Sequence, residues 1–199
     1  SHLKVLNFKM NYKLKKNICN LIEHPILTLS LLHKVLKTYF FKDYIEKKSK
    51  NFFIKNDLIK YFKTNNQKEI SPEWTDLKRI HDLVRTRKPH CTVEFGSGHS
   101  TIVIALALKE NELKDKISGR LFSVDGNQHW IENTKKKIAE DLIKYVQFHF
   151  SKAVISNYNG QVVSLHESLP NVSPNLIYLD GPSPEDVSGD INGLSFQSK

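Results

Sequence analysis

The chain has 199 residues, of which 39% are hydrophobic, so one domain, or one domain with an appendage, is expected. No stretch resembles a secretory signal, and charged residues interrupt the most apolar N-terminal region, residues 21–41, which excludes a membrane span there. The two cysteines, Cys19 and Cys91, give neither a disulfide framework nor metal spacing, so we expect free thiols in a reducing cytoplasm.

The formal net charge of +9 is unevenly distributed. Residues 1–70 hold 15 Lys against 5 acidic residues, whereas residues 71–199 hold 15 basic and 16 acidic residues. The basic third could contact RNA or an anionic membrane surface. However, nucleic-acid sites usually recruit Arg as well as Lys, and the chain has only 4 Arg. We therefore expect no nucleic-acid partner.

The first third of the chain has the periodicity of helices. Pro25 suits a first helical position, and the apolar residues between Leu29 and Phe40 recur at spacings of three and four. A short helix is expected over 57–62, and Ser71-Pro72 is typical of the start of another. We expect residues 1–70 to form a helical cap in front of a core of residues 71–199.

From Cys91 onward, strand-like and helix-like segments alternate. This alternation predicts an α/β fold, a parallel sheet with helices on both faces. Asn159-Gly160 also predicts a hairpin turn between residues 153–158 and 161–165, and residues 187–199 are expected to form a polar loop. The predicted strands are 91–95, 121–124, 145–150 and 176–179, and the predicted helices are 100–109 and 130–142.

The first of these strands leads into the sequence Glu94-Phe95-Gly96-Ser97-Gly98-His99-Ser100-Thr101. Gly96 and Gly98 permit a sharp turn and the close approach of a ligand to the backbone. Ser100 or Thr101 can cap the following helix, whose free N–H groups favour a negatively charged group. The dinucleotide fingerprint requires a third glycine where Thr101 stands, which disfavours an NAD site.

This acid-x-Gly-x-Gly motif resembles motif I of the class I S-adenosylmethionine (SAM) methyltransferases, which have a Rossmann-like fold. The resemblance covers residues 71–186 and implies SAM as cofactor and S-adenosylhomocysteine (SAH) as product. It places the ammonium of SAM near Glu94. It places the carboxylate near the N–H groups of the loop that consists of Gly96, Ser97, Gly98, His99, Ser100 and Thr101. His99 could instead contact the acceptor or be an ordinary loop histidine.

Asp125 ends the second strand, where the resemblance implies hydrogen bonds to both ribose hydroxyls. NAD enzymes place an acid similarly, so this residue indicates an adenosine ligand and not a reaction type. Gly126 and Asn127 would flank the adenine. Trp130 could stack near it, but on its helix a core position is expected. Relatives often carry an acid after the third strand that bonds the adenine amine. Here Ser151 and Lys152 follow, so backbone groups are expected to serve.

Residues 175–182 resemble motif IV, which lies beside the transferred methyl group. Asp180 is the candidate base for a protonated acceptor, with Gly181 beside it. Some O-methyltransferases of this fold use the corresponding acid as a Mg ligand, which Glu185 and Asp186 could join; we assign no metal. The expected acceptor is a small molecule or a saccharide.

Four strands are found where the resemblance implies seven, so the sequence is expected to be truncated or incomplete. The strand over 176–179 would then be an unpaired edge that favours homo-oligomers. Two alternatives stay open: a non-catalytic module that binds SAM or a nucleotide, and an NAD-dependent oxidoreductase.

Overall fold

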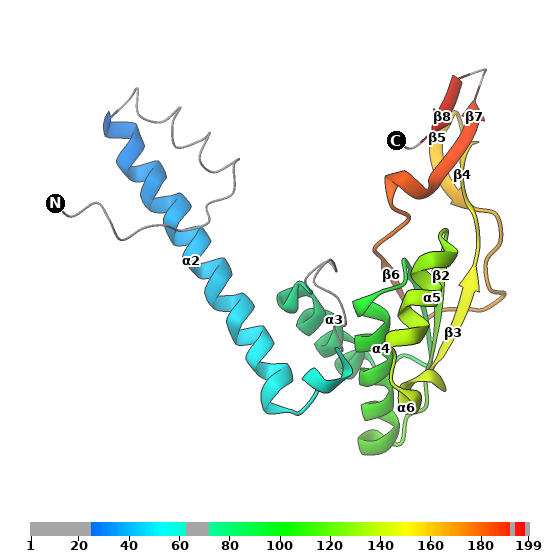
Figure 1. Ribbon diagram of the computed structural model, residues 1–199, viewed down its shortest axis with the longest axis horizontal. Coiled ribbons are helices and arrows are strands. Elements are labelled where there is room, and N and C mark those ends of the chain that lie inside the picture. Colours follow the sequence, from blue (N-terminus) through cyan, green and yellow to red (C-terminus); the bar gives the residue numbers. More distant parts are fainter. Residues whose placement is uncertain (1–24, 63–71, 192–193, 198–199) are drawn as a thin grey trace. The chain divides into compact units, whose positions relative to one another are not determined.

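The computed structural model describes residues 25–62, 72–191 and 194–197 (Figure 1). Its contacts divide the chain into two compact units, with the boundary between Lys48 and Ser49, inside helix α2 (Pro25–Lys55). The helix begins at Pro25 as predicted and continues past Phe40. The predicted cap at Ser71 lies outside the described residues. Among the described residues, no helix combines the length and apolarity needed to cross a membrane.

The last turns of α2 belong to the second unit. Phe53 is fully buried there, and its ring lies 5.3 Å from that of Phe62 and 5.6 Å from that of Trp74. Asp57 has a positive φ of 55° just beyond the end of the helix. The helix predicted over 57–62 is only a short 3-10 turn, η1 (Ile59–Tyr61). This aromatic cluster therefore ties residues 49–62 to the second unit.

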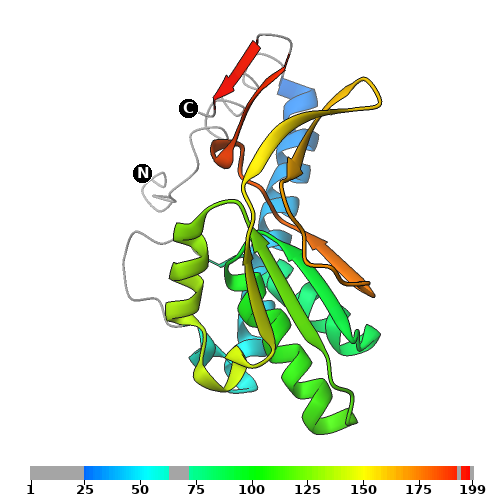
Figure 2. The same ribbon diagram turned by 90° about the vertical axis from the view of Figure 1, so that its right-hand side faces the viewer.

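A four-stranded parallel sheet forms the centre of the second unit (Figure 2). Its strand order is β3-β2-β1-β6, and every neighbouring pair is parallel. The predicted α/β fold with a parallel sheet flanked by helices is confirmed. Parallel strands bring their carboxyl ends to one edge, which is where open α/β sheets bind ligands. The strands are β1 (Cys91–Phe95), β2 (Arg120–Asp125), β3 (Val146–Phe150) and β6 (Leu176–Leu179).

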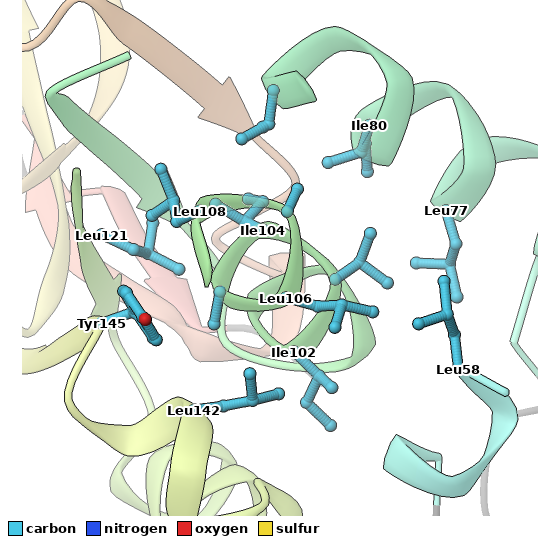
Figure 3. Packing of buried hydrophobic residues seen from close by; sticks show 14 of the residues in the cluster. Leu58, Leu77, Ile80, Ile102, Ile104, Leu106, Leu108, Leu121, Leu142 and Tyr145 are labelled. Atoms are coloured by element: carbon cyan, nitrogen blue, oxygen red, sulfur yellow. The ribbon is translucent and has the colours of Figure 1, made fainter. Parts of the chain in front are cut away.

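Helix α4 (His99–Glu110) forms the hydrophobic centre of this unit (Figure 3). It is buried from Ser100 to Leu108, as expected for a helix that is apolar on every side. It contacts both strand β2 and helix α3 (Trp74–Arg87), and continues into the π-helical turn η2 (Asn111–Asp115). The burial of α4 fixes its N-terminus, and with it the loop that follows β1.

The helix predicted from Trp130 to Leu142 is interrupted. It consists of α5 (Gln128–Lys137) and α6 (Glu140–Ile143), separated by Ile138 in an extended conformation. Ile138 and Leu142 are both buried, so the break keeps two apolar side chains in the core. Trp130, for which a core position was expected, is 37% exposed.

A second sheet, with strand order β5-β4-β7-β8, follows the first. The predicted hairpin is confirmed: Asn159 and Gly160 both have positive φ, as its two-residue turn requires. The polar loop predicted over 187–199 is wrong, because β7 pairs with β4, and β8 pairs with β7. The strands are β4 (Ala153–Tyr158), β5 (Gln161–His166), β7 (Val187–Ile191) and β8 (Leu194–Gln197), and a 3-10 turn, η3 (Pro184–Asp186), precedes β7.

Candidate active site

The loop that follows β1 brings the ends of three strands together. Gly96 has a φ of +100°, in the left-handed region that favours glycine, and its N–H donates to the carbonyl of Val124 at 2.8 Å. A Cβ at this position would lie 3.0 Å from the carbonyl oxygen of Asp180. Two residues on, the N–H of Gly98 donates to Thr101 Oγ1 at 2.9 Å. Glycine at position 96 thus allows the ends of β1, β2 and β6 to approach each other.

Glu94, the acid of the motif, is completely buried below this loop. Its Oε2 accepts hydrogen bonds from Thr101 Oγ1 at 2.6 Å and from Ser123 Oγ at 2.9 Å. Its Oε1 has no hydrogen-bond partner among the described residues. Burial raises the pKa of Glu94 to about 7 despite the hydrogen bonds that it accepts. A buried carboxyl group with one unpaired oxygen is well suited to a cationic partner.

Asp125 lies at the end of β2 and is only 6% exposed. Its Oδ2 accepts the N–H of Ser97 at 2.6 Å, and its Oδ1 accepts the N–H of Asn127 at 2.8 Å. Burial raises the pKa of Asp125, while these two N–H groups oppose the increase. Each carboxylate oxygen keeps a second lone pair, so the side chain is held in place and can still accept hydrogen bonds.

Asp180 lies at the end of β6, across the loop from Asp125. Burial, and then the charge of Asp76, raise the pKa of its carboxyl group. Burial and the charges of Asp180 and Glu94 also raise the pKa of Tyr178 to about 12, which keeps its hydroxyl protonated at neutral pH. This side of the site therefore has a hydroxyl donor next to a carboxylate of raised basicity.

These elements surround one cavity of about 660 Å³. Among the described residues, five acidic side chains line it, against a single lysine, Lys137, and no arginine. The cavity is therefore acidic although the chain as a whole is basic. An acidic, partly enclosed cavity favours cationic ligands. The five acidic residues are Glu73, Asp76, Asp125, Asp180 and Asp186.

Comparison with known protein families identifies residues 93–195, more than half of the chain, as a methyltransferase domain. The chain belongs to this methyltransferase family. The match begins within β1 and ends in β8, so it includes the loop after β1, Asp125 and Asp180.

Two solved structures resemble this methyltransferase domain. One is the O-methyltransferase TomG from Streptomyces achromogenes, involved in tomaymycin synthesis, in complex with SAM. It is 18% identical over 71% of this chain and 55% of that one, with a TM-score of 0.41. The other is the SAH-bound Podospora anserina methyltransferase PaMTH1, 14% identical over 57% of this chain and 48% of that one, with a TM-score of 0.35. This chain spans about half the length of each. Curated proteins gave no significant match.

The methyltransferase domain brings most of the residues predicted for the site to the cavity, but not all. Glu94 and Thr101 lie behind its wall, and Asn127 reaches it only through a hydrogen bond to Asp186 at 2.7 Å. Ser151 and Lys152 are also absent from the lining. The predicted residues that do line it are Gly96, Ser97, Gly98, His99, Ser100, Asp125, Gly126, Asp180 and Gly181.

Several residues of the cavity wall were not predicted from the sequence. Asp76 comes from the first turn of α3, and His166 from the end of β5. Trp130 also lines the cavity, which agrees with a position near the ligand and not with the core position expected for it. No local motif marks these residues, since each reaches the cavity through tertiary packing.

The described residues contain no group of three or more His, Cys, Asp or Glu side chains that could hold a metal ion. Asp186, which the sequence suggested as a companion ligand to Asp180, instead accepts a hydrogen bond from Asn127.

Proposed function

We propose that this domain binds SAM and transfers its methyl group to a small-molecule or saccharide acceptor. The observation that carries the proposal is the hydrogen bond of 2.6 Å from Ser97 N to Asp125 Oδ2. This bond joins the loop after β1 to the acid at the end of β2, beside a single cavity. An adenosine ligand with an amino-acid end needs both elements within reach of one molecule.

The polar groups of the site fit SAM. Glu94 has a buried oxygen without a partner among the described residues, which would compensate a nearby ammonium group. A Cβ added to Gly98 would meet nothing within 4 Å, so the loop leaves open space where a ligand could approach its backbone. The acidic lining suits a ligand that carries a sulfonium and an ammonium charge.

Each end of the site would have a distinct role. The remaining lone pairs of Asp125 would accept the ribose hydroxyls, and the N-terminus of α4 would hold the carboxylate. Gly126 and Asn127 would lie beside the adenine. When bound, SAM would supply an electrophilic methyl group for an in-line displacement. The task of the protein is then mainly to align the acceptor with that group.

Asp180 is the candidate base for an acceptor that must lose a proton. It lines the cavity, and its raised pKa makes it a stronger base than an ordinary aspartate. Tyr178, which stays protonated, could donate a hydrogen bond to the same acceptor. We assign these two residues to the acceptor side because both come from β6, at the opposite edge of the sheet from β3.

Calorimetric titration with SAH and with NAD⁺ tests the cofactor. We expect SAH to bind and NAD⁺ to give no heat, whereas tighter binding of NAD⁺ would contradict the proposal. Transfer of labelled methyl from SAM to components of a cell extract tests catalysis. Asp180→Asn should then slow transfer to a hydroxyl acceptor without weakening SAH binding. Absence of transfer, with SAH bound, would indicate a non-catalytic binding module.

A further inference from the structure

A histidine outside the predicted motifs lies on the wall of the cavity. His166 is the last residue of β5, and its Nδ1 lies 2.8 Å from the carbonyl oxygen of Ser151, which directly follows β3. A carbonyl oxygen only accepts hydrogen bonds, so Nδ1 must carry the proton. In the neutral imidazole, Nε2 is then an acceptor.

This Nε2 atom is buried, and no group in the described part of the chain bonds to it. The ring is held on its other side by Phe95, with ring centroids 5.3 Å apart and an interplanar angle of 35°. The orientation of the ring is therefore fixed from two directions. A buried acceptor without a partner is costly unless a ligand or water supplies a donor.

The neighbours of His166 indicate which end of the proposed ligand it would face. His166 pairs with Ala153 across the hairpin of β4 and β5. Ala153 in turn contacts the residue after Asp125, because a Cβ on Gly126 would lie 3.2 Å from the Cβ of Ala153. His166 thus lies near Asp125, between Phe95 at the end of β1 and Ser151 just after β3.

We infer that His166 recognises the adenine base of the cofactor by accepting a hydrogen bond from its exocyclic amine. This inference rests on the proposed function, since it takes the ligand to be SAM or SAH. The exocyclic amine is the only donor on the base of adenosine, and Nε2 of the neutral ring with a proton on Nδ1 is an acceptor. Relatives often bind the adenine amine with an acid after the third strand, and this chain has no acid there. His166 would take over that hydrogen bond.

Two probes and two substitutions test this contact. The probes are SAH and its analogue in which hydrogen replaces the exocyclic amine. His166→Asn keeps a donor near the position of Nδ1 but removes the acceptor, whereas His166→Gln keeps an acceptor near the position of Nε2. His149→Asn is the matched control, because His149 lies on β3, bonds to Ser168 and does not line the cavity.

We expect the wild-type chain and His149→Asn to bind SAH about tenfold more tightly than the analogue, the effect of one hydrogen bond. His166→Asn should bind both probes equally, and His166→Gln should keep part of the preference. If His166→Asn still binds SAH more tightly than the analogue, or if it weakens the binding of both probes equally, the inference is overturned. A wild-type chain that binds SAH without preferring it to the analogue would overturn it too.

Two further results show whether a failed test is due to a misfolded variant, to a wrong cofactor or to a wrong contact of His166. Nitrogen-15 NMR of histidine-labelled wild-type protein needs no substitution, and the Nε2 resonance of His166 should shift with SAH much more than with the analogue. Equal shifts would contradict the inference. If the wild-type chain binds neither probe, the proposed function fails, and the inference fails with it.

Discussion

Thr101 Oγ1 donates a hydrogen bond of 2.6 Å to Glu94 Oε2, so a helix residue anchors the buried acid at the end of β1. The same hydroxyl accepts the N–H of Gly98 at 2.9 Å. One side chain therefore connects the acid, the loop and the first turn of α4. In the dinucleotide fingerprint a glycine would stand here, and it could make neither bond.

Thr101→Val should disturb this arrangement while it preserves the shape of the side chain. It removes one hydrogen-bond donor of Glu94 and the acceptor of the Gly98 N–H. We expect a loss of about 1–3 kcal/mol in the free energy of unfolding, the range for buried polar groups that lose a partner. Thr101→Ser keeps the hydroxyl and is the matched control. Urea denaturation of both variants checks the prediction, and equal stability would contradict it.

Glu94 should make the stability of the unliganded protein depend on pH. Its pKa is about 7 in the folded protein against 4.5 ordinarily, so between these values the folded state retains a proton that the unfolded state has lost. Stability from this group is then present at low pH and is lost as the pH rises. The loss by pH 8 should be at most about 3 kcal/mol.

Glu94→Gln removes this titration. Relative to the wild-type protein, the variant should therefore be more stable at pH 8 than at pH 5. Denaturant unfolding at both pH values measures the difference, with the half-exposed Glu132→Gln on α5 as control. A difference that does not change with pH would show that Glu94 does not titrate in this range.

Gly96 and Gly98 should respond differently to substitution by alanine. Gly96 has a φ of +100°, and a Cβ there would lie 3.0 Å from the backbone of Asp180. Gly98 has an extended φ of 178°, and a Cβ would meet nothing within 4 Å. We expect Gly96→Ala to cost about 1–3 kcal/mol of stability and Gly98→Ala to cost much less. Thermal unfolding of the pair measures this, and equal melting temperatures would contradict it.

Phe53 tests whether the end of α2 is part of the second unit. Its side chain is fully buried among aromatic rings, so Phe53→Ala should cost about 3–5 kcal/mol. The neighbouring Ile54 is 48% exposed, and Ile54→Ala is the control. Calorimetric unfolding of the two variants checks the prediction. A small effect of Phe53→Ala would mean that residues 49–62 are dispensable for the core.

The sequence could predict those parts of the fold whose structure is determined by residues that are neighbours in the chain. The run from Cys91 to Phe95 is apolar and ends in a turn, so its bounds as a strand were correct. Asn159 and Gly160 fixed the hairpin because few other residue pairs tolerate two positive φ values. The site could be predicted at the loop from Gly96 to Ser100 and at Asp125 and Asp180, because each follows or ends a strand that the sequence marks locally.

The remaining features depend on tertiary pairing. Strand β7 has the sequence Val-Ser-Gly-Asp-Ile, which is not strongly apolar, and it is a strand because β4 lies beside it. The break at Ile138 contains neither proline nor glycine and follows from the burial of Leu142. His166 and Asp76 reach the cavity from elements that carry no motif.

The most direct test of the account is calorimetric titration of SAH into the wild-type chain and into Asp125→Asn. Asp125 accepts two backbone N–H groups and lines the cavity, so its remaining lone pairs are the proposed acceptors for the ribose. We predict that the wild-type chain binds SAH and that Asp125→Asn weakens binding by about 10- to 100-fold, while Glu132→Gln has no effect. Equal affinity of the wild-type chain and Asp125→Asn, or no binding by the wild-type chain, would contradict the account.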